Sequence, residues 1–213
     1  TPSAGIQELR EAAARYLGGM RGLEVSPDDI VIGAGAKPFI AYAILCCTDY
    51  GAGDEVIFPN PGFPIYESQI RAHGAVPVPI FLREKRQFAF DPNELADKIT
   101  NKTKLLILNS PQNPTGGILS RQNMEDIASI LHKHPQVWVY ADDIYGRLVY
   151  DGKFISIAEL PGMQERTIIT DGASKTWAMT GWRLGFAANK ALAPHFTRWV
   201  TNTDSCASQI TQW

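Results

Sequence analysis

Residues 167–183 read TIITDGASKTWAMTGWR, an apolar run that passes directly into a segment of small and functional side chains. The β-branched residues 167–170 predict a buried strand, and the segment after them predicts a loop at the carboxyl end of that strand. Lys175 in this loop has small and apolar neighbours instead of the acids that would keep an amine solvated. Because desolvation favours the neutral amine, which attacks carbonyl groups, Lys175 is a candidate nucleophile.

The same strand-then-loop pattern repeats along the whole chain. Apolar strand-like runs are expected at 30–32, 55–58, 76–81, 104–108, 137–140, 167–170 and 184–187, and they alternate with helical segments at 6–20, 37–48, 65–73, 120–134 and from about 191 onward. Continuously apolar strands separated by helices predict an α/β fold with three layers, α/β/α, around a mostly parallel sheet. Two prolines in 76–81 favour an edge position for that strand. Ligands of such sheets bind at the carboxyl ends of the strands, so the loops that follow the strands are the expected site.

Composition excludes several classes of protein. The 213 residues are 45% hydrophobic and 20% charged, and 20 Lys and Arg against 22 Asp and Glu give a net charge of −2. The high apolar fraction argues against intrinsic disorder. The near-zero net charge, without a basic run, argues against nucleic acid as a partner. No apolar stretch approaches the roughly 18 residues that would span a membrane. Cys46, Cys47 and Cys206 suggest reduced thiols of a cytoplasmic protein, and the histidines lack metal-ligand spacing, so no metal is expected.

Two loops early in the chain offer candidate ligand contacts. Residues 33–37, Gly-Ala-Gly-Ala-Lys, open a helix, and small side chains there let backbone N–H groups approach an anion. A plain tight turn is the alternative interpretation of this loop. Phe63, held among prolines after the strand at 55–58, can stack on a planar ring, and ordinary core packing is the alternative.

Three later residues are candidates for polar contacts. Asn113 lies in the loop 109–117, whose prolines and glycines restrict the backbone, so its amide can bond one ligand oxygen with little freedom. Asp142 ends a strand among apolar neighbours, where a carboxylate is costly without a cationic partner, so it is a candidate for contact with a ligand cation. A structural ion pair or a helix cap is the alternative interpretation of Asp142. Arg183 presents a planar fork suited to phosphate.

In their order and spacing, these motifs resemble a known enzyme family. The set consists of Asn113-Pro114-Thr115-Gly116, Asp142-x-x-Tyr145, and Ser174-Lys175 with Arg183. It resembles the class I/II aminotransferases, which are fold-type I enzymes dependent on pyridoxal 5′-phosphate. The resemblance covers essentially all of 1–213 and implies the cofactor-binding large domain, without the small-domain segments that precede and follow it. In the family, an arginine for the substrate carboxylate would lie beyond Trp213, and a tyrosine that reaches the partner subunit's phosphate would lie just before Thr1.

The resemblance implies a role for each matching residue around the cofactor ring. Lys175 would form the internal aldimine and shuttle a proton between the substrate Cα and the cofactor C4′. Asp142 would hold the pyridinium nitrogen protonated, so that the ring accepts electrons. Tyr145 and Asn113 would donate hydrogen bonds to the phenolic oxygen, and Phe63 would stack on the ring.

The resemblance also implies which residues would bind the cofactor phosphate. The loop of Gly35, Ala36 and Lys37 would supply backbone N–H groups, and Arg183 would supply its guanidinium. Some members carry a phosphate-binding serine where this chain has Gly172, which leaves the part played by Ser174 open.

The expected function is transamination through a lysine aldimine, from an amino acid to a 2-oxo acid, by a ping-pong cycle in a cytoplasmic homodimer of amino acid metabolism. One alternative keeps the cofactor and changes the reaction, giving a pyridoxal-phosphate-dependent C–S lyase or eliminase. Another is a non-catalytic, aminotransferase-like regulatory domain. A hydrolase nucleophile elbow at Gly172-x-Ser174 fails, because that fold needs an acid and then a histidine downstream, whereas His195 precedes Asp204. The donor amino acid is not fixed by these motifs.

Overall fold

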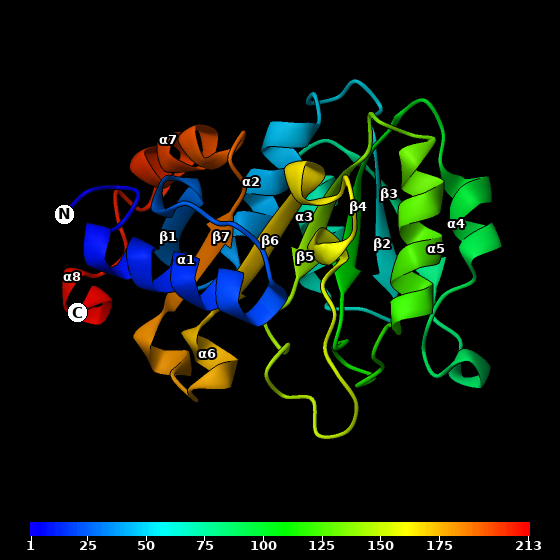
Figure 1. Ribbon diagram of the computed structural model, residues 1–213. Helices are drawn as coiled ribbons and strands as arrows, with labels where there is room; N and C mark the ends of the chain where they lie inside the picture. The colour runs from blue at the N-terminus through cyan, green and yellow to red at the C-terminus, as the bar shows by residue number, and fades with distance from the viewer.

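The computed structural model describes residues 1–213 and contains one seven-stranded sheet in the order β1-β7-β6-β5-β4-β2-β3 (Figure 1). The strands are β1 (Ile30–Ala34), β2 (Glu55–Asn60), β3 (Val76–Phe81), β4 (Thr103–Asn109), β5 (Trp138–Asp142), β6 (Thr167–Gly172) and β7 (Leu184–Ala188). Strand β7 runs antiparallel to both of its neighbours, β1 and β6, and every other pair is parallel. The predicted mostly parallel sheet is confirmed, and proline-containing β3 lies at an edge as expected.

Helices cover both faces of the sheet, which confirms the three-layer arrangement (Figure 1). One face carries α1 (Gln7–Arg21), α4 (Pro92–Lys98) and α5 (Arg121–His132). The other face carries α2 (Pro38–Cys47), α3 (Ile65–Ala72) and α7 (Ala193–Thr203). Two short helices, α6 (Ala173–Thr176) and α8 (Gln209–Gln212), complete the set. No helix is both long enough and apolar enough to cross a membrane.

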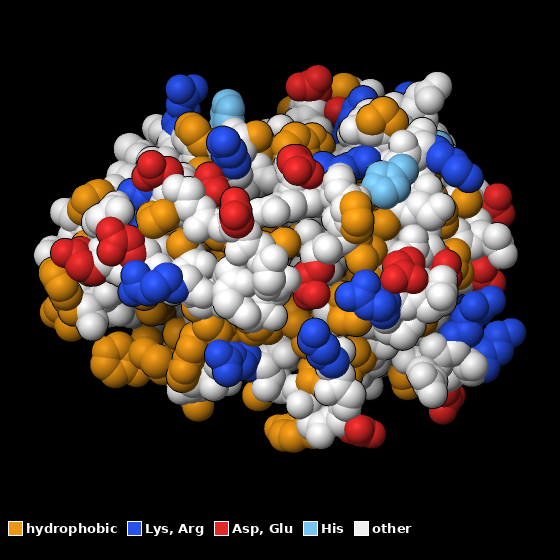
Figure 2. Space-filling model, in the orientation of Figure 1, with side chains coloured by type: hydrophobic (Ala, Val, Ile, Leu, Met, Phe, Trp, Pro, Cys, Tyr) orange, Lys and Arg blue, Asp and Glu red, His pale blue; other side chains and the backbone are white.

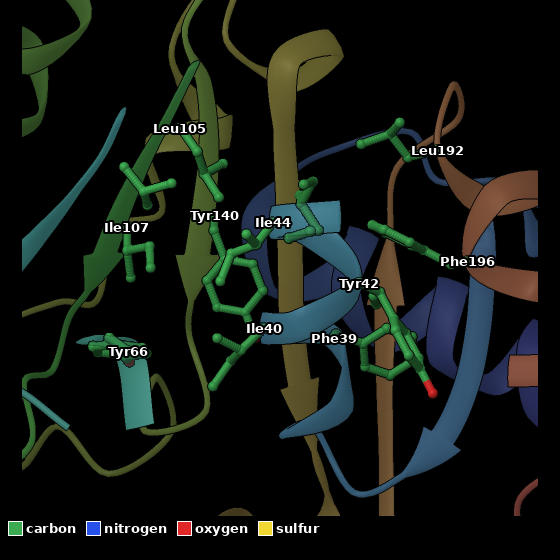
Figure 3. Close-up of a cluster of buried hydrophobic side chains, with 14 of the residues drawn as sticks. Phe39, Ile40, Tyr42, Ile44, Tyr66, Leu105, Ile107, Tyr140, Leu192 and Phe196 are labelled. Carbon is green, nitrogen blue, oxygen red and sulfur yellow. The ribbon is translucent and has the colours of Figure 1, made fainter. Parts of the chain in front are cut away.

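The strands are apolar on both sides because each side meets a layer of helices. In β4, Leu105 and Ile107 pack into the cluster under α2 and α3, whereas Leu106 and Leu108 pack into the cluster under α4 and α5. Figure 3 shows Tyr140 of the sheet directed toward Ile40 and Ile44 of α2. Each fully buried side chain of this size contributes roughly 1.5–3 kcal/mol, so the two-sided burial fixes the register of the central strands.

Local signals explain where the helices begin and end. Ser120 caps α5 as predicted: its Oγ accepts the N–H of Asn123 at 3.2 Å, and the side chain of Asn123 accepts the N–H of Ser120 at 3.0 Å. The helix ends at His132, earlier than the expected 134, because Pro135 disfavours helical backbone at the residue before it. Helix α4 was not predicted; Asp91 caps it by accepting the N–H of Asn93 at 3.0 Å.

Candidate active site

A cavity of about 460 Å³ lies at the carboxyl ends of β4, β5 and β6, beside the first residues of α2 and α3. Its lining residues come from six separate parts of the chain: Ala36, Lys37, Ile40, Phe63, Tyr66, Asn109, Asn113, Tyr140, Asp142, Ile144, Tyr145, Ser174, Lys175, Thr180 and Arg183. Every candidate site residue from the sequence except Gly35 lines this cavity. The parallel strands therefore bring together loops that are far apart in the chain, as expected for this class of sheet.

Asp142 is a buried acid without a cationic partner. Asp142 is the last residue of β5 and is 8% exposed. None of the ion pairs in the chain includes it. Burial, and to a smaller extent the adjacent Asp143 carboxylate, raise the pKa of Asp142 to about 6, against hydrogen bonds from Tyr66 and the backbone of Ile144. A cationic group of a ligand beside Asp142 would offset the cost of burying the charged carboxylate.

The raised pKa predicts how the stability of the ligand-free protein depends on pH. The pKa of Asp142 is about 6 in the folded protein, against an ordinary value of 3.8. The folded state therefore binds this proton more tightly than the unfolded state does. The contribution of protonated Asp142 to the free energy of unfolding is fully present below about pH 4 and is lost as the pH rises through about 6. We expect Asp142→Asn, which does not ionise, to gain melting temperature relative to the parent over that interval.

The measurement compares thermal melting of the parent and Asp142→Asn at several pH values. Asp97→Asn, which removes a carboxylate from the exposed side of α4, is the control for the loss of one negative charge. A constant difference between Asp142→Asn and the parent across this pH range would contradict the assignment.

Tyr66 holds the Asp142 carboxylate. It is fully buried in α3, and its hydroxyl donates a hydrogen bond of 2.6 Å to Asp142 Oδ2. Burial and the Asp142 charge raise the pKa of Tyr66 well above its ordinary value, so the hydroxyl keeps its proton and remains a donor. Tyr66 was not among the site residues predicted from the sequence. Its position three residues after Phe63 was the available signal; Phe63 lies just before α3, and the two rings meet edge-on at 5.7 Å.

Asn109 joins the loop after β4 to the end of β5. It is buried, and its side-chain amide donates to the carbonyl oxygens of Asp142 at 3.0 Å and Pro111 at 3.3 Å. Its side-chain oxygen accepts the backbone N–H of Asn113 at 2.8 Å. Asn109 therefore fixes Asn113 relative to Asp142. Asn109 was not among the site residues predicted from the sequence, because no local pattern indicates its contact with another strand.

Gln112 organises the loop that presents Asn113. Its side-chain nitrogen donates to the carbonyl oxygen of Pro61 at 2.9 Å, and its oxygen accepts from the N–H and the hydroxyl of Thr115 at 2.9 and 2.6 Å. The first bond ties this loop to the segment that carries Phe63. On the cavity side, the amide of Asn113 reaches the hydroxyl of Tyr145 at 3.5 Å, so both polar groups face the same space.

Lys175 lies at the open side of the cavity. Its side chain is exposed, and Nζ lies 5.8 Å from the centroid of the Tyr145 ring. The expectation that its small and apolar neighbours would desolvate the amine is therefore wrong for this chain. Adjacent residues of a helix point in different directions, so buried Ala173 does not cover Lys175, which α6 directs outward.

Part of the cavity lining is suited to receive an anion, and we call it the anion-binding end; it consists of Ala36, Lys37 and Arg183. The backbone N–H groups of Ala36 and Lys37, just before α2, donate to no backbone carbonyl, and they lie where a helix N-terminus favours negative charge. Arg183 donates to the carbonyl oxygen of Ala34 at 3.2 Å and to that of Thr180 at 3.0 Å. Gly35 allows this approach, since a Cβ there would lie 2.4 Å from an Arg183 Nη.

Three glycines pair across β1, β7 and β6 below this anion-binding end. Gly33 and Gly172 each oppose Gly185 in the two antiparallel pairs. A Cβ on Gly185 would lie 2.2 Å from the nitrogen of Ala36 and 2.3 Å from the carbonyl carbon of Gly35. The absence of a side chain at Gly185 therefore lets the 35–36 loop rest directly on β7.

Gly185→Ala is expected to destabilise the protein by about 1–3 kcal/mol, the usual cost of forcing extra atoms into a packed site. Backbone atoms, which cannot move aside as a flexible side chain would, surround the new methyl group. Urea unfolding of the variant measures the change. Gly181→Ala is the matched control because nothing lies within 4 Å of a Cβ there. Equal stabilities of the two variants would show that the 35–36 loop tolerates displacement.

The lining of the cavity defines the ligand that fits. Free N–H groups and Arg183 suit an anionic group such as phosphate, whereas Asp142 suits a protonated nitrogen. The aromatic side chains of Phe63 and Tyr145 line the same cavity and suit a planar ring. The exposed amine of Lys175 stands beside this space and is accessible to a carbonyl group of the same ligand.

Comparisons with known proteins agree with this arrangement. The family model described as Aminotransferase class I and II matches residues 1–212. A putative aminotransferase of Bacillus subtilis (strain 168) is 41% identical over 193 residues, which are 90% of this chain and 49% of that protein. An aspartate aminotransferase of Pinus pinaster is 41% identical over 215 residues, covering 100% of this chain and 43% of that protein.

Solved structures give the same result. An aromatic aminotransferase from Pyrococcus horikoshii superposes with a TM-score of 0.95 at 36% identity, covering 100% of this chain and 56% of that one. An aspartate aminotransferase from Thermus thermophilus superposes with a TM-score of 0.95 at 33% identity, covering 100% and 55%. The chain spans about half the length of the curated relatives it matches. The match over nearly the whole chain, together with the similarity of the fold, shows that the chain belongs to the class I and II aminotransferase family.

Proposed function

We propose that the full-length protein is a pyridoxal-phosphate-dependent aminotransferase that moves an amino group from an amino acid to a 2-oxo acid. The observation that carries this proposal is the cavity that holds Lys175 and the buried, cation-free Asp142 together with an anion-binding end. The family membership of the chain and the names of its relatives support the same activity.

The residues present fit this cofactor. Ala36 and Lys37, with their free N–H groups, and Arg183 would hold the phosphate, and the half-buried Ser174 would add its hydroxyl. Phe63 would stack on the ring. When bound, pyridoxal phosphate supplies an electron sink that stabilises negative charge developing at the substrate Cα.

The remaining residues would act on protons. Asp142, kept in place by Tyr66 and Asn109, would hold a proton on the ring nitrogen. Tyr145 and Asn113 would donate hydrogen bonds to the phenolic oxygen. Lys175 would hold the cofactor covalently and would move a proton between the substrate Cα and the cofactor C4′ once the substrate has replaced it.

The test is a panel of amino acid donors with 2-oxoglutarate as acceptor, using the full-length protein. Relatives of this chain are named for aspartate, asparagine and aromatic amino acids, so these donors come first. We expect at least one donor to yield glutamate and its own 2-oxo acid in equal amounts. Release of ammonia or sulfide without an acceptor would favour the eliminase alternative, and cofactor binding without turnover of any donor would favour a regulatory domain.

We further propose a cytoplasmic homodimer with no nucleic acid or membrane partner. Two large aromatic side chains next to α6 support an interface: Trp177 is 49% exposed and Trp182 is 54% exposed. Figure 2 shows hydrophobic side chains gathered at the lower left, over this part of the fold. The three cysteines are unbridged, which fits a reducing compartment. Sedimentation of the full-length protein measures the assembly state, and a monomer would contradict the proposed homodimer.

A further inference from the structure

A second charged cluster lies behind the active site, on the face of the sheet covered by α1. It consists of Arg21, the last residue of α1, with Asp143 and Asp171. Arg21 donates from Nε to Asp143 Oδ2 at 3.0 Å and from Nη2 to Asp171 Oδ2 at 3.4 Å. The three side chains are 0%, 5% and 1% exposed, so this is a fully buried ion cluster. Helix α1 lies across β1, β7 and β6 in Figure 1.

The two acids of this cluster stand next to the residues of the proposed site. Asp143 directly follows Asp142, and because successive side chains of an extended chain point to opposite faces, Asp142 lines the cavity while Asp143 meets Arg21. Asp171 belongs to β6, the strand that leads into Lys175. Its second oxygen accepts the N–H of Gly172 at 2.7 Å, where α6 begins.

One guanidinium therefore bridges the carboxyl ends of β5 and β6. The two ends also touch directly, since the N–H of Asp143 donates to the carbonyl oxygen of Thr170 at 3.0 Å. Arg21 is the cation that allows both acids to be buried side by side. Burial raises the pKa of Asp143 and raises that of Asp171 to about 6, and the Arg21 charge opposes both shifts. Without this cation, the two carboxylates would repel or take up protons, and the strand ends would lose their common anchor.

Stability alone does not account for this cluster. Buried ion clusters are often replaceable by apolar side chains without loss of stability. The buried side-chain atoms that lack any hydrogen-bond partner are Arg21 Nη1, Tyr16 Oη and Thr176 Oγ1. Two of them belong to α1, and Thr176 follows Lys175 in α6. Of these atoms only Arg21 Nη1 belongs to the cluster, and a buried donor without a partner lowers stability, so stability does not by itself explain the cluster.

We propose that Arg21 is a positioning residue of the active site, which holds the ends of β5 and β6 from the far face of the sheet and so keeps Asp142 and Lys175 in place at one ligand. The inference rests on the proposed function. Arg21 touches neither the cavity nor a bound ligand; it acts through Asp143 and Asp171. The planar fork of arginine suits two acceptors, whereas a lysine supplies the charge without the fork.

The test uses the full-length protein loaded with pyridoxal phosphate, and the variants Arg21→Met and Arg21→Lys. We expect Arg21→Met to lower kcat about 10–100-fold, the scale expected from small displacements of reacting groups. The pH midpoint of the bound cofactor's absorbance should shift in the same variant, because that midpoint responds to the placement of Asp142 and Lys175. Arg21→Lys should lie between Arg21→Met and the parent in both measurements.

Arg10→Met is the matched control. Arg10 also belongs to α1 and is only 16% exposed, but it bonds Asp28 and the carbonyl oxygens of Pro27 and Ile30, away from β5 and β6. It should lose melting temperature while keeping the parent's kcat and absorbance midpoint. Parent values in Arg21→Met, or equal losses of kcat in the Arg10 and Arg21 variants, would overturn the proposal.

Two further outcomes keep the test decisive. If Arg21→Met does not fold, Arg21→Lys is compared alone with the parent, and unchanged kcat and absorbance midpoint in it would overturn the proposal. The absorbance midpoint needs bound cofactor but no turnover. A parent protein that binds the cofactor and transaminates no donor therefore refutes the proposed function, while the midpoint shift in the Arg21 variants still decides the role of Arg21.

Discussion

Lys175→Ala is expected to lower kcat/KM of the full-length enzyme by at least about 10²–10⁴-fold, the loss from proton transfer alone. The amine has two proposed tasks, covalent attachment of the cofactor and proton transfer at the substrate Cα, and alanine performs neither. Because the side chain of Lys175 is exposed, its removal should leave folding largely unchanged. Steady-state kinetics with the best donor, beside a melting curve, separates the chemical loss from unfolding.

Lys37 provides the matched control for this substitution. It is the other lysine that lines the cavity, and its Nζ lies 5.7 Å from the centroid of the Phe63 ring. Lys37→Ala keeps the backbone N–H proposed to bind the phosphate, so it should leave both cofactor binding and covalent attachment largely intact. A Lys175→Ala enzyme within about tenfold of the parent would contradict the lysine's role, since proton transfer by a positioned group is worth more than that.

Asp142→Ala is expected to lower turnover about 10²–10³-fold while changing cofactor affinity far less, the scale for removing one group that stabilises charge in the transition state. Asp142 is buried at the cavity wall without a cationic side chain, so its charge is available to a protonated ring nitrogen. The proposed phosphate contacts, which do not involve Asp142, should keep the cofactor bound. Retention is measured by equilibrium dialysis and turnover by steady-state kinetics.

Two further substitutions separate charge from packing at this position. Asp142→Glu keeps the negative charge and should retain more turnover than Asp142→Asn, which keeps the size and loses the charge. Asp142→Asn and Asp142→Ala remove the buried carboxylate and with it the cost of its desolvation, so neither is expected to fail through unfolding. Kinetics of Asp142→Ala equal to those of the parent would eliminate the proposed role of Asp142 at the ring nitrogen.

The fold could be predicted from the sequence because its strongest signals are local. Central strands such as β4, which is apolar from Leu105 to Leu108, have both faces covered, and the prolines of β3 exclude it from the interior of the sheet. Helix α4 escaped prediction because it is short and follows a polar stretch without clear periodicity. The antiparallel direction of β7 likewise depends on the path of the chain through α6, which no local pattern encodes.

The candidate site was located from the sequence because its loops follow strands, and parallel strands end at one edge. What the sequence could not supply was contact between distant elements. Tyr66 meets Asp142 across 76 positions of sequence, and Arg21 meets Asp143 and Asp171 across 122 and 150 positions. The exposure of Lys175 was also wrongly predicted, because burial is a property of the assembled fold and not of neighbouring residue types.

Mass spectrometry of the loaded full-length protein, reduced with borohydride and digested, tests the central claim most directly. We expect one modified peptide, with the pyridoxyl group on Lys175 and none on Lys37. A modified Lys37, or active enzyme with no modified lysine in the cavity, would contradict the assignment of Lys175 and with it the proposed chemistry of the site.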